Sequence, residues 1–579
     1  MFRGIAASPG IAIGRVFVWD SEEYTINKYK IEENQIPIEI TRFEEALIKT
    51  RSEILSIQKK ISKEMGVQHA EIFNAHLLVL EDRMLIEEVI NKIKKEKVNV
   101  EHIFVEVIKK YADIFSKMDD EYLRERLIDI QDVGKRITHN LLGKKKQELF
   151  EQKEKIIVIA TNLSPTDTAL MSQDKVIGFA TDMGGRTSHT VILARSLEIP
   201  AVVGLKELTP QVKNRDIVIV DGNQGVVIIN PTKQVISKYL KEKKKFENFE
   251  KNLGRLKTLP AVTKDGHEVV VGANIEFPEE IASVLSHGAQ GIGLYRTEYM
   301  YLNRSDLPTE EEHFQAYKKV AQSMKKNPVV IRTMDIGGDK FVSHLDIPNE
   351  MNPLMGRRAI RFCLARPDIF KTQLRGILRA SVYGNLKIMY PMISGLDELR
   401  QANQILEEAK HTLKRKHIEY DKNIEVGIMI EVPSAGLIAD ILAKEVAFFS
   451  IGTNDLIQYS LAVDRINEKI AYLYEPAHPA VLRFIKSIID AGHAAGIWVG
   501  MCGEMAAEPV FTLLLLGLGL DEFSASPISI PELKKVIRSV RYEQAKEIAQ
   551  RALEFNTAIK IEQFARTKIK EMIYNKKGN

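Results

Sequence analysis

The spacing of apolar residues changes several times along the chain, and each change predicts a different kind of structure. Residues 1–20 contain two short apolar runs beside glycines, Ile5–Ala7 and Ile11–Trp19, which predict strands. Between residues 21 and 145 the apolar residues recur at helical spacing among lysines and glutamates. One stripe of this kind comprises Phe43, Leu47, Ile54, Ile57 and Ile61. We therefore expect this segment to be all-helical.

Short β runs return after the helical segment. They are Ile156–Ala160, Val176–Ala180, Ile217–Asp221 and Val226–Ile229. We expect these runs to complete the sheet that begins at the N-terminus, so that residues 1–20 and 146–230 form one α/β unit with residues 21–145 inserted into it. Residues 231–257 are charged and keep a helical pattern without interior proline, which predicts an exposed linker helix.

Beyond the linker, buried β runs alternate with helical stretches over residues 258–579. The runs are Glu268–Asn274, Gly291–Arg296, Val329–Asp335, Leu386–Pro391, Glu425–Glu431, Phe448–Thr453, Ile497–Cys502 and Leu520–Ser524. Such alternation predicts a (β/α)8 barrel with its active site at the carboxyl ends of the strands. The expected fold class is an α/β multidomain chain that ends in this barrel.

The amino-acid composition of the chain excludes several classes of protein. The 579 residues include 82 Lys plus Arg and 78 Asp plus Glu, and this near-balance argues against a nucleic-acid coat or a polybasic membrane anchor. The longest apolar run, Pro509–Leu520, is shorter than the roughly 20 residues that cross a bilayer. Two cysteines, Cys363 and Cys502, are too few for a disulfide framework. We expect a soluble protein of the cytoplasm.

A glycine-rich loop carries a candidate nucleophile. The run Gly184–Thr190 contains His189 and precedes an apolar stretch with helical character. Thr187 or Ser188 can cap that helix, and the free amides at its start attract an anion. A neutral imidazole there is well placed to accept a phosphoryl group. The competing interpretation is a capped turn with an exposed histidine.

Arginines follow two successive barrel strands. Arg296 and Arg332 stand at strand ends, and guanidinium forks match phosphate and carboxylate oxygens. A salt bridge to Glu298 or Asp335 is an equally good explanation for either arginine alone. Arg358 lies in a further basic loop, for which a solvated surface loop is the stronger alternative. Arg465 follows Asp455 closely enough in sequence to reach a bound phosphate.

Two carboxylates and a thiol also occupy strand ends. Glu431 and Asp455 follow neighbouring buried strands, where an unpaired charge is costly, and together they offer two oxygens to Mg²⁺. Helix capping by Asp455 is the alternative. Cys502 lies between glycines at the end of the seventh barrel strand, which favours a role as proton donor or acceptor at a carbon centre. Buried cysteines are usually inert, and Cys363 fits that description.

The histidine loop resembles the phosphohistidine signature of the phosphoenolpyruvate-utilising enzymes, and Asn162–Thr168 resembles the stretch that precedes it there. When the barrel motifs are included, essentially the whole chain resembles the enzyme I family of bacterial sugar phosphotransferase systems. It implies that His189 accepts the phosphoryl group, that Thr168 orients it and that Cys502 protonates the enolpyruvate carbon. It further implies that phosphoenolpyruvate is bound by Arg296, Arg332, Arg358, Asn454 and Arg465, and Mg²⁺ by Glu431 and Asp455.

The same resemblance implies partners. The helical insert would dock the phosphocarrier protein HPr, the α/β unit would swivel as the phosphohistidine domain, and the barrel would form a homodimer. The expected reaction releases pyruvate and is the first step of sugar uptake. Pyruvate phosphate dikinase or phosphoenolpyruvate synthase is a rival, but the chain shows no glycine-rich nucleotide loop or spare length for an ATP-binding domain. A non-catalytic phosphocarrier or regulatory scaffold is the other alternative.

Overall fold

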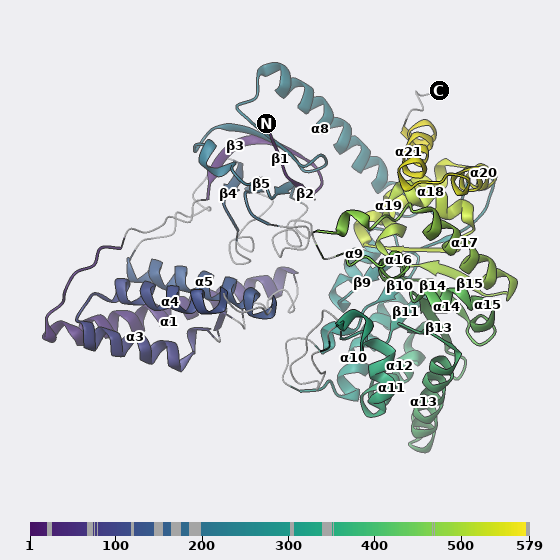
Figure 1. The fold of residues 1–579 in the computed structure, drawn as a ribbon, viewed down its shortest axis with the longest axis horizontal. Helices are drawn as coiled ribbons and strands as arrows, with labels where there is room; N and C mark the ends of the chain where they lie inside the picture. Colours follow the sequence, from purple (N-terminus) through teal and green to yellow (C-terminus); the bar gives the residue numbers. More distant parts are fainter. Residues whose placement is uncertain are drawn as a thin grey trace. The chain divides into compact units, whose positions relative to one another are not determined.

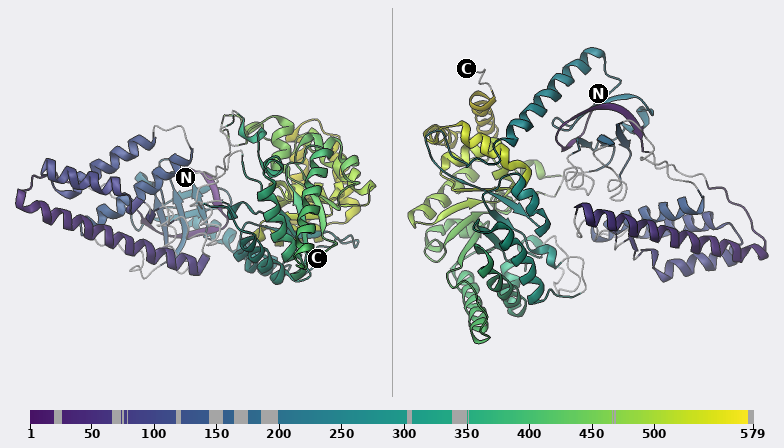
Figure 2. Two further views of the ribbon diagram at one scale, coloured as in Figure 1. Left: turned by 90° about the horizontal axis from the view of Figure 1, so that it is seen from below. Right: turned by 180° about the vertical axis from the view of Figure 1, so that it is seen from behind.

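The computed structural model describes most of the chain in two compact units. The described residues are 1–19, 26–65, 73, 76–77, 79–116, 121–143, 155–163, 175–184, 199–301, 306–337, 350, 352–465, 467 and 469–574. The units are Met1–Glu250 and Lys251–Asn579 (Figures 1 and 2). In the described part of the chain, no helix combines the length and apolar character needed to cross a membrane.

The first unit contains the expected mixed sheet. Its strands are β1 (Phe2–Arg3), β2 (Ile5–Ser8), β3 (Ile11–Val18), β4 (Ile156–Ala160), β5 (Val176–Thr181), β6 (Ala201–Val203), β7 (Ile217–Asp221) and β8 (Val226–Ile229). Their order across the sheet is β1-β8-β7-β3-β4-β5-β6-β2. Because β3 pairs in parallel with β4, the strands on either side of the insert lie next to each other in one sheet. The prediction of a split α/β unit is confirmed.

The inserted segment forms helices with a core of their own. They are α1 (Ile36–Met65), α3 (Arg83–Glu96), α4 (Val100–Ser116) and α5 (Glu121–Leu141). Phe43 and Phe104 pack within this core with ring centroids 5.6 Å apart. Helix α3 starts where the Asp82 side chain accepts hydrogen bonds from the amides of Met84 and Leu85. The all-helical prediction is therefore confirmed.

The predicted linker contains α8 (Lys233–Gly254). At its start, Val235 and Tyr239 pack against Ile11 and Ile219 of the sheet. The domain boundaries given above stay predictions.

The second unit is a closed barrel of eight parallel strands. They are β9 (Val270–Ile275), β10 (Ile292–Tyr295), β11 (Val329–Arg332), β12 (Leu386–Tyr390), β13 (Glu425–Ile430), β14 (Phe448–Ile451), β15 (Trp498–Met501) and β16 (Glu522–Ala525). Every predicted barrel strand is present, with ends shifted by a few residues. The barrel prediction is confirmed, and parallel pairing brings all carboxyl strand ends to one face.

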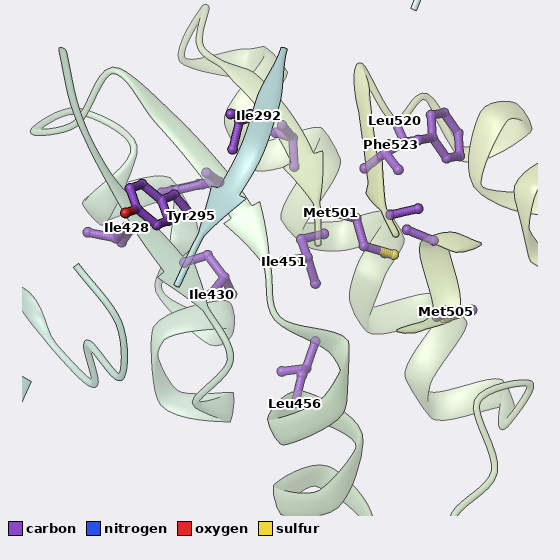
Figure 3. Close-up of a cluster of buried hydrophobic side chains, with 14 of the residues drawn as sticks. Ile292, Tyr295, Ile428, Ile430, Ile451, Leu456, Met501, Met505, Leu520 and Phe523 are labelled. Carbon is purple, nitrogen blue, oxygen red and sulfur yellow. The ribbon is translucent and has the colours of Figure 1, made fainter. Parts of the chain in front are cut away.

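Helices cover the outside of the barrel (Figure 1). They are α9 (Ile281–Ser286), α10 (Glu310–Met324), α11 (Ala359–Ala365), α12 (Pro367–Ala380), α13 (Leu396–Arg415), α14 (Pro433–Leu437), α15 (Ala439–Leu442), α16 (Thr453–Leu461), α17 (Pro479–Ala494), α18 (Pro509–Leu518), α19 (Ile530–Ser539), α20 (Tyr542–Leu553) and α21 (Ala558–Ile569). Alternate strand residues face these helices, including Ile292, Ile451 and Met501 (Figure 3).

The remaining strand residues fill the barrel interior. Leu294, Val330, Met389, Met429 and Phe448 form this second cluster, which also includes Cys502. The interior is thus a packed core, and the polar residues at the strand ends lie above it, where they are available for chemistry.

Candidate active site

The catalytic face of the barrel gathers the predicted residues of the second unit. Arg296 follows β10, Arg332 ends β11, Glu431 follows β13, Asp455 lies in the first turn of α16 after β14, and Cys502 follows β15. The four of these residues that adjoin a strand stand at its carboxyl end because the apolar run ends at that residue or just before it, whereas Asp455 follows β14 after Gly452 and the start of α16.

Arg332 is buried between two carboxylates. Its Nη1 lies 3.0 Å from Asp335 Oδ2, and its Nη2 donates to Glu298. Burial alone lowers the pKa of Arg332, but Glu298 and Asp335 outweigh it and raise that pKa well above the ordinary value. The salt bridges that competed with a substrate role are therefore present. However, the buried Nε of Arg332 has no hydrogen-bond partner among the described residues, which leaves one donor for a ligand.

Arg358 shares one of these carboxylates. Its Nη2 lies 3.0 Å from Asp335 Oδ1 and 3.4 Å from Asp455 Oδ2. Only 5% of Arg358 is exposed, so this residue is not part of a solvated basic loop. Asp335 thus joins the two guanidinium groups of Arg332 and Arg358. The sequence analysis offered Asp335 as a salt-bridge partner of Arg332 but missed its pairing with Arg358, because Arg358 comes from a different segment of the chain.

Glu431 is buried beside two further acids. Its Oε1 accepts a 2.7 Å hydrogen bond from the Met392 amide. Burial raises the pKa of Glu431, and the negative charges of Asp455 and Asp335 raise it further, against the opposing effect of Arg332 and Arg358.

These acids suit a hard divalent cation. Carboxylate oxygens are the donors that Mg²⁺ prefers, and a bound cation relieves the repulsion that raises the Glu431 pKa. Helix α16 begins at Thr453 after Gly452, so Asp455 is not its N-cap and the capping alternative does not apply. Within the described ranges, no three Asp, Glu, His or Cys residues form a complete metal site. Glu431 and Asp455 would therefore need oxygens from substrate and water.

Cys502 is a buried thiol with a hydroxyl beside it. Ser450 Oγ donates to its Sγ at 3.3 Å. Burial raises the pKa of Cys502 to about 11, although Ser450 and Arg332 partly oppose this effect. At neutral pH the thiol keeps its proton and is able to donate it. The sequence analysis missed Ser450, although a hydroxyl at an inward-facing strand position two residues after Phe448 was an available signal.

The other proposed substrate ligands lie nearer the surface. Arg296 pairs with Glu276. The Asn454 Nδ2 and Arg465 Nη1 atoms each donate to Glu504 Oε1 at 3.1 Å. Glu504 is a further residue that the sequence analysis missed.

The proposed nucleophile and its orienting residue, His189 and Thr168, lie outside the described residues. The described segment before His189 contains β5 and extends to Gly184, whose φ of 114° is a conformation that favours glycine. Their roles stay predictions.

Comparison with known proteins gives consistent matches over the chain. Family models of PEP-utilising enzymes match residues 3–126 as the N-terminal domain, 152–225 as the mobile domain and 250–542 as the PEP-binding domain. The phosphoenolpyruvate-protein phosphotransferase of Staphylococcus carnosus is 47% identical over 96% of this chain and 97% of its own length. The Haemophilus influenzae protein of that name is also 47% identical, over 97% and 98%.

A solved structure described as enzyme I is 51% identical and covers 43% of this chain and 100% of its own, with a TM-score of 0.38. The family models and the two relatives show that the chain belongs to the family of PEP-utilising enzymes, together with the phosphoenolpyruvate-protein phosphotransferases.

Proposed function

We propose that this chain is a phosphoenolpyruvate-protein phosphotransferase. It moves the phosphoryl group of phosphoenolpyruvate to His189 and then to a histidine of HPr, and it releases pyruvate as the first step of sugar uptake. One observation carries the proposal: the barrel face holds buried Arg332, whose Nε has no hydrogen-bond partner among the described residues, in one charge cluster with Arg358, Glu431 and Cys502. The two relatives at 47% identity bear the corresponding name.

The arginines do most of the binding in this proposal. Phosphoenolpyruvate carries a phosphate and a carboxylate, which suit the guanidinium groups of Arg296, Arg332, Arg358 and Arg465, with the Asn454 amide as a further donor. Phosphoryl transfer passes through a loose transition state, so the protein contributes mainly position and charge neutralisation. Asp335 supports this role because it fixes Arg332 and Arg358 relative to each other.

Glu431 and Asp455 would hold Mg²⁺, which when bound neutralises charge on the transferring phosphoryl group. Their contribution is to supply hard oxygens from two neighbouring strand ends. Because the pKa of Glu431 is raised, a metal ion competes with a proton for this carboxylate.

Cys502 completes the reaction at carbon. The Cys502 S–H proton moves to C3 of enolpyruvate, the S–H electron pair stays on sulfur as thiolate, and the enolate becomes the ketone pyruvate. The Ser450 hydroxyl, already 3.3 Å from the sulfur, stabilises that thiolate. Protonation removes the enolate and so favours formation of phospho-His189.

The remaining assignments follow the family relationship. Thr168 orients His189, the helical insert binds HPr, the swivelling α/β unit carries the phosphohistidine, and the barrel forms the homodimer. Two free, buried cysteines fit the cytoplasm as the location.

Labelled phosphoenolpyruvate tests the proposal. Incubation with ³²P-phosphoenolpyruvate and Mg²⁺, without nucleotide, is expected to give acid-labile label on the protein. His189→Ala should abolish the label, whereas His411→Ala, at an exposed histidine of α13, should keep it. Label that requires ATP would support a dikinase-type enzyme instead, and no label under either condition would support a non-catalytic scaffold. Either result rejects the proposal.

A further inference from the structure

Two loops on the catalytic face are joined by a clasp, which consists of Asn454, Gly503, Glu504 and Arg465. The β14 loop is Gly452 with the first turn of α16, which carries Asn454; the β15 loop carries Gly503 and Glu504, where a 3-10 turn begins. The Glu504 amide donates to Asn454 Oδ1 at 3.0 Å, and Asn454 Nδ2 donates back to Glu504 Oε1 at 3.1 Å. This reciprocal pair of hydrogen bonds fixes both the distance between the loops and their relative orientation.

Gly503 brings the two backbones together within the clasp. A Cβ at this position would lie 2.7 Å from the Thr453 amide nitrogen and would also overlap Thr453 Oγ1. The φ of Gly503 is −72°, so space and not backbone conformation requires glycine. The loops therefore touch through main chain, and the Asn454–Glu504 hydrogen bonds close the contact beside it.

The clasp connects residues with different proposed roles. Asn454 precedes Asp455, a proposed metal ligand, and Glu504 lies two residues after Cys502, the proposed proton donor. A shift of one loop against the other would therefore move the metal and substrate ligands relative to the thiol. Misplacement by about 1 Å is enough to cost an enzyme about 100-fold in rate.

Glu504 also holds a third group. Its Oε1 accepts from Arg465 Nη1 at 3.1 Å as well as from Asn454 Nδ2, so one oxygen aligns two proposed substrate ligands. The Glu504 side chain is 77% exposed and that of Arg465 38% exposed. Exposed ion pairs contribute little to folding stability, so stabilising the fold does not account for this arrangement.

We propose that Glu504 is a positioning residue that sets the β14 and β15 loops, and with them Asn454, Arg465 and Cys502, in register for reaction with phosphoenolpyruvate. The inference rests on the proposed function. Glu504 acts through its hydrogen bonds and not through its charge, because a negative carboxylate by itself repels an anionic substrate.

Two substitutions separate hydrogen bonding from charge. Glu504→Ala removes the acceptor, whereas Glu504→Gln keeps an Oε1 acceptor without the negative charge. Glu554→Ala is the matched control, because it removes an exposed glutamate that pairs with Arg551 after α20. Each variant is made in the full chain and checked for an unchanged melting temperature.

Two readouts are measured. Calorimetry in a His189→Ala background gives the phosphoenolpyruvate Kd with Mg²⁺ and without turnover. Label transfer to intact His189 gives kcat and KM. We expect Glu504→Ala to raise Kd about tenfold and to lower kcat/KM by at least that factor. Glu504→Gln should recover most of both losses, and the control should match the parent chain.

The possible outcomes distinguish failure of the inference from failure of the proposed function on which it rests. If the parent chain takes label and Glu504→Ala matches it in Kd and kcat/KM, Glu504 has no positioning role. If Glu504→Gln is as impaired as Glu504→Ala, charge is what acts and the inference is also overturned. If the parent chain neither binds phosphoenolpyruvate nor takes label, the proposed function fails and the inference falls with it.

Discussion

Glu522 is a buried acid that the proposed chemistry does not use, and it makes the stability of the barrel depend on pH. It lies on β16, in space left by inward-facing glycines: a Cβ at Gly272 or Gly293 would lie 2.7 or 2.5 Å from Glu522 Oε1. Burial raises the pKa of Glu522 from 4.5 to about 7, and the Lys387 ammonium opposes the shift only in part. Glu522→Gln keeps the shape and removes the ionisation.

The expected magnitude follows from that pKa. Well below pH 4.5 the Glu522 carboxyl is protonated in the folded and unfolded chains alike, so its ionisation does not lower the free energy of unfolding. As the pH rises toward 7, the unfolded chain ionises freely and folded stability falls; above about pH 8 the loss is complete. A pKa difference of about 2.5 corresponds to about 3 kcal/mol. Glu522→Gln should therefore gain about 1 kcal/mol at pH 5 and about 3 kcal/mol at pH 8.

Urea unfolding measures this gain. The chain has two tryptophans, so a Trp19→Phe background leaves Trp498, which stacks on Phe448 with centroids 4.5 Å apart, as the reporter of the barrel. Glu543→Gln, at an exposed site on α20, is the control and should show no gain. The reasoning is refuted if Glu522→Gln is no more stable at pH 8, or if its gain is the same at both pH values.

Three further substitutions test the catalytic face. Cys502→Ala should slow the exchange of the C3 hydrogens of pyruvate with solvent deuterium by about 10²- to 10⁴-fold, the usual contribution of a general acid; an unchanged rate by NMR argues against the thiol. Asp455→Asn should raise the Mg²⁺ concentration for half-maximal labelling by about tenfold or more, and an unchanged midpoint would exclude it as a ligand. Gly503→Ala forces the loops apart at Thr453, so it should cost about 1–3 kcal/mol of stability and reduce turnover; a chain with parental stability and rate contradicts the close contact.

The fold was largely predictable because its strands are apolar runs between turn residues. The runs Ile156–Ala160, Ile217–Asp221 and Val226–Ile229 became β4, β7 and β8 with the same bounds. Strand β6, Ala201–Val203, was missed because three residues between Pro200 and Gly204 are too short for a periodic pattern. The ends of the barrel strands differ from the predicted ends where polar end residues do not pair with the neighbouring strand. Strand β11, for example, ends at Arg332 and not at Asp335.

The candidate site was predictable only in part. Strand ends identified Glu431, Asp455 and Cys502 as neighbours, because parallel strands end on one face. No local pattern shows that Glu504 hydrogen-bonds Asn454, 50 residues earlier, or that Ser450 reaches Cys502, 52 residues later. Those contacts depend on how adjacent barrel loops pack, which is tertiary structure.

The central claim is that phosphoenolpyruvate phosphorylates His189 without a nucleotide. Peptide mapping by mass spectrometry after a single turnover, with pyruvate measured in the same sample, tests it most directly. The account predicts one phosphoryl group on the peptide containing His189 and one pyruvate released for each. Phosphate on another residue, or pyruvate formed without phosphohistidine, would contradict it.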